Sequence, residues 1–77
     1  MRARWKYIVY LDEDGEEVLE TFEPAIIHAK YAENAGVPRG RIVSAGFATA
    51  ERECYGASTS LGVNSRPRAD TALLRDG

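Results

Sequence analysis

A thiol and an imidazole are the side chains in this chain with the clearest capacity for chemistry. His28 is the only histidine and Cys54 the only cysteine among 77 residues. Catalysis by such a pair requires the imidazole within hydrogen-bond reach of the thiol, and a third group to orient the ring. The sequence around Cys54 shows no cationic or helix-terminal setting that would favour a thiolate. We therefore predict a His at the edge of a buried helix face, a Cys packed in a strand, and no enzymatic activity.

The run 56–62 is rich in Gly and Ser, the residue types of phosphate-binding loops and of hydrolase nucleophile turns. It lacks the Gly-Lys-Ser/Thr ending of the former and the Gly-x-Ser-x-Gly pattern of the latter. A bulged or edge strand with small side chains accounts for the same residues, and close approach of a partner backbone is the alternative. No cofactor is predicted.

Acidic residues are concentrated in one segment. Residues 12–23 carry seven acids and no base, whereas residues 1–11 carry three bases and no acid. The flanking residues have strand character, which does not match the helix-loop-helix setting of a calcium loop, so no metal site is predicted. A solvated hairpin tip is the plain interpretation. Electrostatic docking on a basic protein surface is the functional one.

Bases and aromatic residues alternate along residues 2–7, as they do in proteins that bind single-stranded nucleic acids. Trp5 and Tyr7, however, fall on the strand face that should meet a helix, and there is no sustained basic stripe of the kind that neutralises phosphates. A nucleic-acid-binding regulator is therefore kept as the alternative function. It would use Arg2, Arg4, Lys6, Arg66 and Arg68, and would stack bases on Tyr10 or Tyr55.

A hairpin is the first element that would position these residues. Aromatic and β-branched residues alternate over 5–11, which predicts a strand with Trp5, Tyr7, Val9 and Leu11 on its helix-facing side. The Asp-Gly pair at 14–15 predicts a turn, and 16–22 resumes an extended pattern.

The rest of the chain completes an α+β domain. Pro24 suits a first helical turn and Gly36 suits a left-handed terminator, so a helix is predicted over 24–35. Alternating patterns predict strands over 41–49 and 54–61. The expected fold is an antiparallel four-stranded sheet in β-β-α-β-β order with the helix packed on one face. Residues 1–64 would form the domain, and 65–77 a tail with one or two helical turns.

The sequence shows no membrane or secretion signal. No stretch approaches the roughly 20 apolar residues of a membrane-spanning helix, and the first residues lack the apolar core of a signal peptide. A single cysteine cannot form an internal disulfide. These features predict a cytoplasmic protein without membrane contact.

The small size of the chain favours association. A domain of this length buries only about 60% of the surface that its unfolded chain exposes, and a sheet with one helix leaves a face and an edge open. We expect a homodimer through the open face or an edge strand of the sheet, or a host protein as partner. The predicted contact surface comprises the outward apolar residues Ile8, Tyr10, Leu19 and Leu61 and the acidic residues Asp12, Glu13, Asp14, Glu16 and Glu17.

The assembled pattern resembles the small proteins of phages, prophages and other mobile elements. It comprises a Trp/Tyr-rich hairpin, a helix beginning at Pro24, the segment Ser44-Ala45-Gly46-Phe47 before a Ser/Gly-rich strand, and Ser65-Arg66-Pro67. The resemblance is one of size and style over the whole chain. It implies a non-enzymatic module that binds and blocks a host protein, as anti-CRISPR proteins of similar size do, and it assigns no role to an individual residue.

Overall fold

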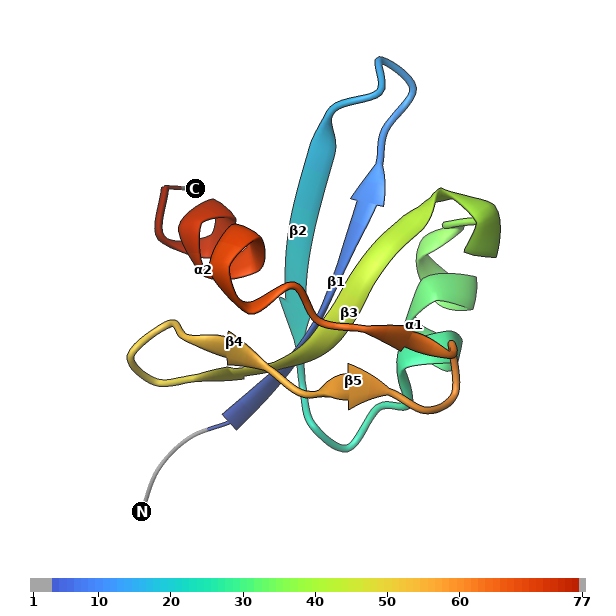
Figure 1. The fold of residues 1–77 in the computed structure, drawn as a ribbon. Coiled ribbons are helices and arrows are strands. Elements are labelled where there is room, and N and C mark those ends of the chain that lie inside the picture. Colours follow the sequence, from blue (N-terminus) through green and yellow to red (C-terminus); the bar gives the residue numbers. More distant parts are fainter. Residues whose placement is uncertain (1–3, 77) are drawn as a thin grey trace.

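Strand β1 (Arg4–Leu11) lies at the centre of the fold in a computed structural model that describes residues 4–76. It pairs antiparallel with β2 (Glu17–Phe22) through a hairpin and with β3 (Ile42–Thr49) on its other side. The short strand β4 (Cys54–Tyr55) continues the sheet, whose order is β2-β1-β3-β4 (Figure 1). The predicted α+β class and the antiparallel four-stranded sheet are confirmed.

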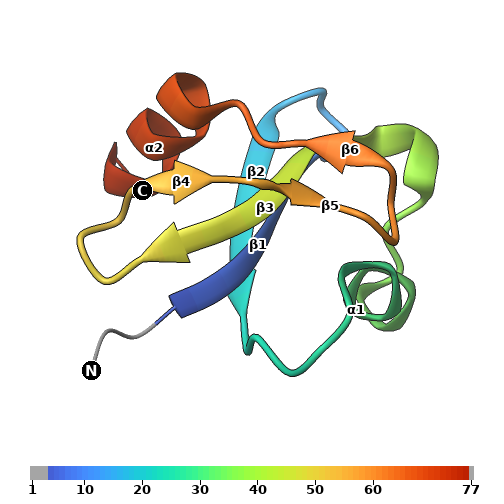
Figure 2. The ribbon, with the colours of Figure 1, turned by 60° about the horizontal axis from the view of Figure 1, so that its bottom comes forward.

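The fourth strand is shorter than predicted because the chain turns at Gly56. This residue has a φ of 84°, which side chains with a Cβ rarely adopt, and an added Cβ would lie 2.9 Å from the Phe47 ring. Beyond the turn, β5 (Ala57–Ser58) leaves the main sheet and pairs with β6 (Val63–Asn64) in a separate two-stranded sheet (Figure 2). The prediction of one strand over 54–61 was therefore wrong.

Helix α1 (His28–Ala35) begins four residues later than predicted. Pro24 lies instead in a turn over 23–26, which a backbone hydrogen bond of 3.1 Å closes. Ile27, at the N-cap position, has extended backbone and no side chain that could cap the helix. The predicted end is confirmed: Gly36 has a φ of 74° and caps the helix in the left-handed conformation. A short 3-10 turn (Arg39–Arg41) then leads into β3.

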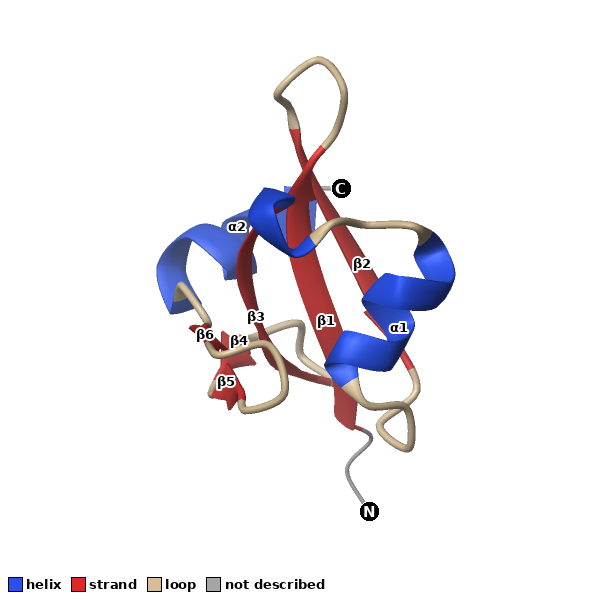
Figure 3. Ribbon diagram, turned by 90° about the vertical axis from the view of Figure 1, so that its right-hand side faces the viewer, coloured by secondary structure: helices blue, strands red, loops and turns tan. Residues whose placement is uncertain are grey.

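The segment predicted as a tail contains the longer helix, α2 (Pro67–Asp76). Pro67 occupies the first helical position, and Asp70 supplies an acid in the first turn, where the helix dipole favours negative charge. Leu73 and Leu74 pack against the second face of the sheet. The sheet therefore has α1 on one face and α2 on the other (Figure 3), and the predicted open face is covered.

The strand alternation was predicted correctly, but its two sides were assigned the wrong way round. Ile8 is fully buried beneath α1, together with Phe22 and Ala45. Tyr7 and Val9, expected beneath that helix, are fully buried on the α2 face. Because both sides of β1 are apolar, its pattern could not show which side meets which helix. Ile8 therefore cannot contribute to the exposed contact surface that the sequence predicted.

Candidate protein-binding surface

The turn between β1 and β2 projects beyond the sheet (Figure 1). Its residues include a group of carboxylates. Oδ1 of Asp12 accepts hydrogen bonds of 2.9 Å from the backbone N–H groups of Asp14 and Glu16, which holds the turn in one conformation. Nη1 of Arg41 donates to the carbonyl oxygen of Asp12 at 2.7 Å. This contact fixes the base of the turn through the backbone and leaves the carboxylates available.

The acidic side chains of the turn have no cationic partner in the described structure. Glu13, Asp14 and Glu16 are exposed, and within residues 4–76 none of them lies in an ion pair. The exposure of these side chains agrees with the solvated acidic hairpin tip that the sequence predicts. A rigid turn with several unpaired carboxylates presents a concentrated negative potential.

The other predicted contact residues are spread over two parts of the molecule. Tyr10 and Leu19 lie half-buried on the same hairpin as the acids, and the Tyr10 hydroxyl donates to Glu20 at 2.7 Å. That hydrogen bond raises the pKa of Tyr10. Leu61 lies outside the hairpin, between β5 and β6, and packs against the α1-side core. Tyr10 and Leu19 face opposite sides of the hairpin, toward α1 and α2, so the predicted residues do not form one patch and the acids of the turn are their exposed part.

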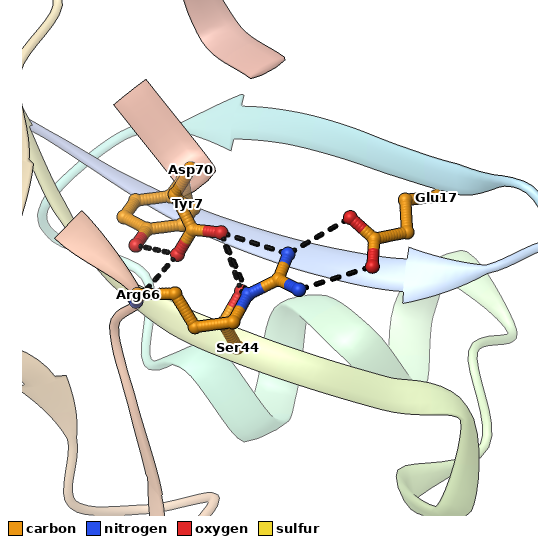
Figure 4. A network of polar contacts seen from close by, with 5 residues as sticks. All are labelled: Tyr7, Glu17, Ser44, Arg66 and Asp70. Carbon is orange, nitrogen blue, oxygen red and sulfur yellow. Dashed lines mark hydrogen bonds and ion pairs between the residues drawn. The ribbon is translucent and has the colours of Figure 1, made fainter. Parts of the chain in front are cut away.

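Glu17, the last predicted acid, belongs to a network that the sequence did not reveal (Figure 4). Its carboxylate accepts two hydrogen bonds, of 3.0 and 2.9 Å, from the Arg66 guanidinium. The same guanidinium lies 2.9 Å from the carboxylate of Asp70. Hydrogen bonding to Glu17 raises the pKa of Arg66, and the reciprocal contact lowers the pKa of Glu17. One edge of the planar guanidinium thus binds Glu17 of β2, and another edge binds Asp70 of α2.

Asp70 is the buried centre of this network. It is fully buried and accepts hydrogen bonds from the Tyr7 hydroxyl at 2.5 Å, the Ser44 hydroxyl at 2.9 Å and the Arg66 backbone N–H at 2.8 Å. Burial, followed by the contact with Asp70, raises the pKa of Tyr7. A carboxylate so enclosed cannot reach a substrate, so the network ties α2 to β1, β2 and β3. The signals in the sequence were Pro67 at a helix start and an Arg-Asp pair spaced four residues apart.

The thiol and the imidazole do not meet. The His28 ring is buried on the α1 face, edge-on to Phe22 and Phe47, with Nε2 2.9 Å from the Gly46 carbonyl oxygen. Cys54 is buried on the α2 face, so the sheet separates the two side chains. Burial lowers the pKa of His28 and raises the pKa of Cys54, the opposite of what an activated thiolate requires.

A group of cationic and aromatic side chains lies at the opposite end of β1 from the acidic turn. The Arg4 guanidinium is 4.9 Å from the centre of the Phe47 ring, and that ring lies 5.7 Å from Tyr55, which is 38% exposed. Lys6 lies beside Phe47 in the register and donates to the Ile26 carbonyl oxygen at 2.8 Å. The two ends of β1 therefore differ in charge and composition.

The structure also bears on metal binding and on membrane contact. In the part of the chain that the structure describes, no three His, Cys, Asp or Glu side chains converge as metal ligands would, and no helix there is long and apolar enough to cross a membrane. The candidate surface comprises the exposed acidic turn, residues 12–16, and strand β2 that follows it. Comparison of the chain with known protein families, with curated proteins and with solved structures found no match.

Proposed function

We propose that this protein is a non-enzymatic protein-binding module that docks through the β1–β2 hairpin on a basic surface of its partner. The observation that carries the proposal is the rigid projecting turn, whose exposed acids Glu13, Asp14 and Glu16 have no ion-pair partner among residues 4–76. Following the resemblance to mobile-element proteins, we propose a host protein as the partner. Both faces of the sheet are covered, the Ile8 side by α1 and the Tyr7 side by α2, so a homodimer through an open face is disfavoured and a dimer would have to use a strand edge.

The negative charge of the hairpin indicates which kind of partner surface it would bind. Residues 12–23 carry seven acids without a base, so a basic surface would be attracted before contact and oriented as it approaches. Such steering weakens over a Debye length of about 8 Å at physiological ionic strength. Binding should therefore decline steeply as salt is added.

The test is a matched pair of triple variants. In the first, Glu13→Gln, Asp14→Asn and Glu16→Gln neutralise the turn; in the second, Glu33→Gln, Glu51→Gln and Glu53→Gln remove the same charge elsewhere. Proteins captured from a host lysate by the wild type are identified, and the binding of each purified candidate is measured by calorimetry. We expect the first variant to lose at least about ten-fold in affinity, equivalent to about 1.4 kcal/mol, and the second to bind like the wild type. Equal binding by all three proteins would refute the proposal.

Nucleic-acid binding is the second candidate, favoured by the cation-aromatic group at the other end of β1. Tyr55 is accessible there beside Phe47 and Arg4, and stacking on an aromatic ring contributes roughly 1–3 kcal/mol per base. Arg66, which the sequence offered as a further base, is occupied by Glu17 and Asp70. Titration with fluorescent single-stranded and duplex oligonucleotides at low salt tests this candidate. Binding that Tyr55→Ala weakens and Tyr10→Ala does not would support it.

A further inference from the structure

Among residues 4–76, no backbone partner lies along the outer edge of β2. β2 lies at the border of the main sheet and pairs only with β1 (Figure 3). The Asp12 N–H bonds to the Glu16 carbonyl oxygen, and hydrogen-bonded and non-hydrogen-bonded pairs alternate along an antiparallel ladder. It follows from the register that the backbone groups of Glu17, Leu19 and Thr21 point away from β1. Within residues 4–76 these outward groups have no hydrogen-bond partner.

An apolar cleft runs beside this edge on the α2 side. It has a volume of about 250 Å³ and is lined by Glu17, Val18 and Leu19 of β2 and by Leu73 and Leu74 of α2. Side chains in a strand alternate between the two faces of the sheet. A strand added to β2 would therefore place every second side chain in this cleft, against the leucines, and the intervening side chains on the α1 side.

The negative charge along the β2 edge favours a basic segment over a second copy of this strand. The strand and its flanks contain Glu16, Glu17, Glu20 and Glu23 and no base. Arg66 pairs with Glu17, whereas the other three have no ion pair within residues 4–76, and the acidic turn continues from one end. On the α1 side the Glu20 carboxylate accepts from Tyr10 and Tyr31, and this contact raises the pKa of Tyr31 to about 12. A second copy of β2 would bring like charges face to face, which is unfavourable for directly opposed strands. A basic strand would not meet this repulsion.

We infer that the β2 edge takes up an extended segment of the partner protein, with alternating basic and apolar residues, as an added antiparallel or parallel strand. The apolar residues would enter the cleft between Leu19 and α2, and the basic residues would lie beside Glu20 and the acidic turn. The inference rests on the proposed function and specifies its chemistry: main-chain hydrogen bonds supply attachment, and the two side-chain faces supply selectivity.

The experiment uses isotope-labelled protein and three synthetic peptides in an NMR titration. The first is acetylated Lys-Val-Lys-Leu-Lys-Val-Lys amide, the second replaces each Lys by Glu, and the third keeps the first sequence but methylates alternate backbone nitrogens. For the first peptide we expect saturable shifts along β2 and at least about ten-fold slower hydrogen exchange at the outward Leu19 and Thr21 amides. The inward amides of Val18 and Glu20 should change little.

Two variants of an exposed edge residue sharpen the result. Thr21→Pro removes an outward N–H without touching the ladder with β1, and a proline is tolerated at such an edge position. Thr21→Ala is the matched control, since it keeps the N–H. The proline variant should bind the first peptide at least ten-fold more weakly than the alanine variant, a step of about 1.4 kcal/mol. Equal binding by the two variants, or by the methylated peptide, would overturn strand addition.

The remaining outcomes separate this inference from the proposed function. Shifts confined to residues 12–16, without protection at Leu19 and Thr21, would overturn strand addition and leave electrostatic docking of the turn in place. Protection of β2 that grows with protein concentration in the absence of peptide would assign the edge to a second copy. If none of the peptides causes shifts, the acidic residues serve only to prevent the β2 edge from pairing with another strand, and the inference is overturned. The turn variants tested on captured proteins decide the proposed function independently.

Discussion

The two helices are attached to the same sheet by different kinds of interaction. On the α1 side, Tyr31 stacks on Phe22 with ring centres 4.0 Å apart and donates a hydrogen bond to the half-buried Glu20, but the fully buried side chains of this core are apolar and no buried carboxylate lies among them in the described residues. On the α2 side, the apolar contact of Leu73 and Leu74 is supplemented by the fully buried Asp70 and its hydrogen-bond donors. Apolar packing depends on volume and weakly on direction, whereas a buried carboxylate depends on every donor around it. The α1 side should therefore tolerate substitution that the α2 side does not.

The largest expected effect is at Asp70. Asp70→Ala would leave the hydroxyls of Tyr7 and Ser44 and one side of the Arg66 guanidinium without their acceptor. Breaking a buried pair in this way costs about 3–5 kcal/mol, a large part of the stability of so small a domain. Urea unfolding monitored by Trp5 fluorescence measures the loss. Asp76→Ala, at the exposed end of the same helix, is the control, and a loss below about 1 kcal/mol at Asp70 would contradict the proposed difference between the helices.

A conservative change in the α1-side core should cost less. Phe22→Leu keeps an apolar side chain against Tyr31 and His28 but loses the ring stack. Substitutions that nearly conserve volume cost less than about 1.5 kcal/mol, and we expect about 1 kcal/mol here. The same urea titration gives the value. If this substitution destabilised the protein as much as Asp70→Ala, the contrast between the two sides would be lost.

Acidification should weaken the α1 side through its buried imidazole. Burial lowers the pKa of His28 in the folded protein, so between the folded and unfolded pKa values the unfolded chain binds the extra proton. This contribution to stability is present above about pH 6.5, the ordinary histidine pKa, and declines as the pH falls through the folded value. From pH 7.5 to 5.5 we expect a loss of up to about 1.4 kcal/mol in urea titrations.

The single histidine makes the assignment direct. His28→Phe keeps an aromatic ring in the pocket between Phe22 and Phe47 and cannot be protonated. Its stability should change much less over the same pH range than that of the wild type. An unchanged pH dependence in this variant would place the titrating group elsewhere.

The smallest effect is expected for the ion pair on the surface of α1. Lys30 and Glu33 lie 3.6 Å apart, but both side chains are largely exposed. Solvent screening limits such pairs, so Glu33→Gln should change the unfolding free energy by less than about 0.5 kcal/mol. A larger loss would show that this ion pair within α1 contributes more than an exposed pair ordinarily does, and would weaken the contrast with α2.

A local sequence signal does not by itself fix where a helix begins. Pro24 and Pro67 carry the same start signal for a helix, yet only Pro67 begins one. Asp70 follows Pro67 within the first turn and has donors to bind in the sheet, whereas the residues after Pro24 turn once before α1 begins at His28. A helix start thus depended on tertiary partners that a local pattern does not contain.

The amino-acid pattern alone was enough to predict the first hairpin, its acidic turn, the third strand, the Gly36 terminator and the α+β class. Each depends on alternation, turn residues or charge within about a dozen neighbouring residues, so a local pattern contains the information that it needs. The packing of the whole chain, by contrast, placed Ile8 beneath α1 and Tyr7 beneath α2, and it joined Arg66 both to Glu17, 49 residues away, and to Asp70. Those choices follow from which surfaces can be covered together, and a strand that is apolar on both sides is compatible with either arrangement until both helices are in place.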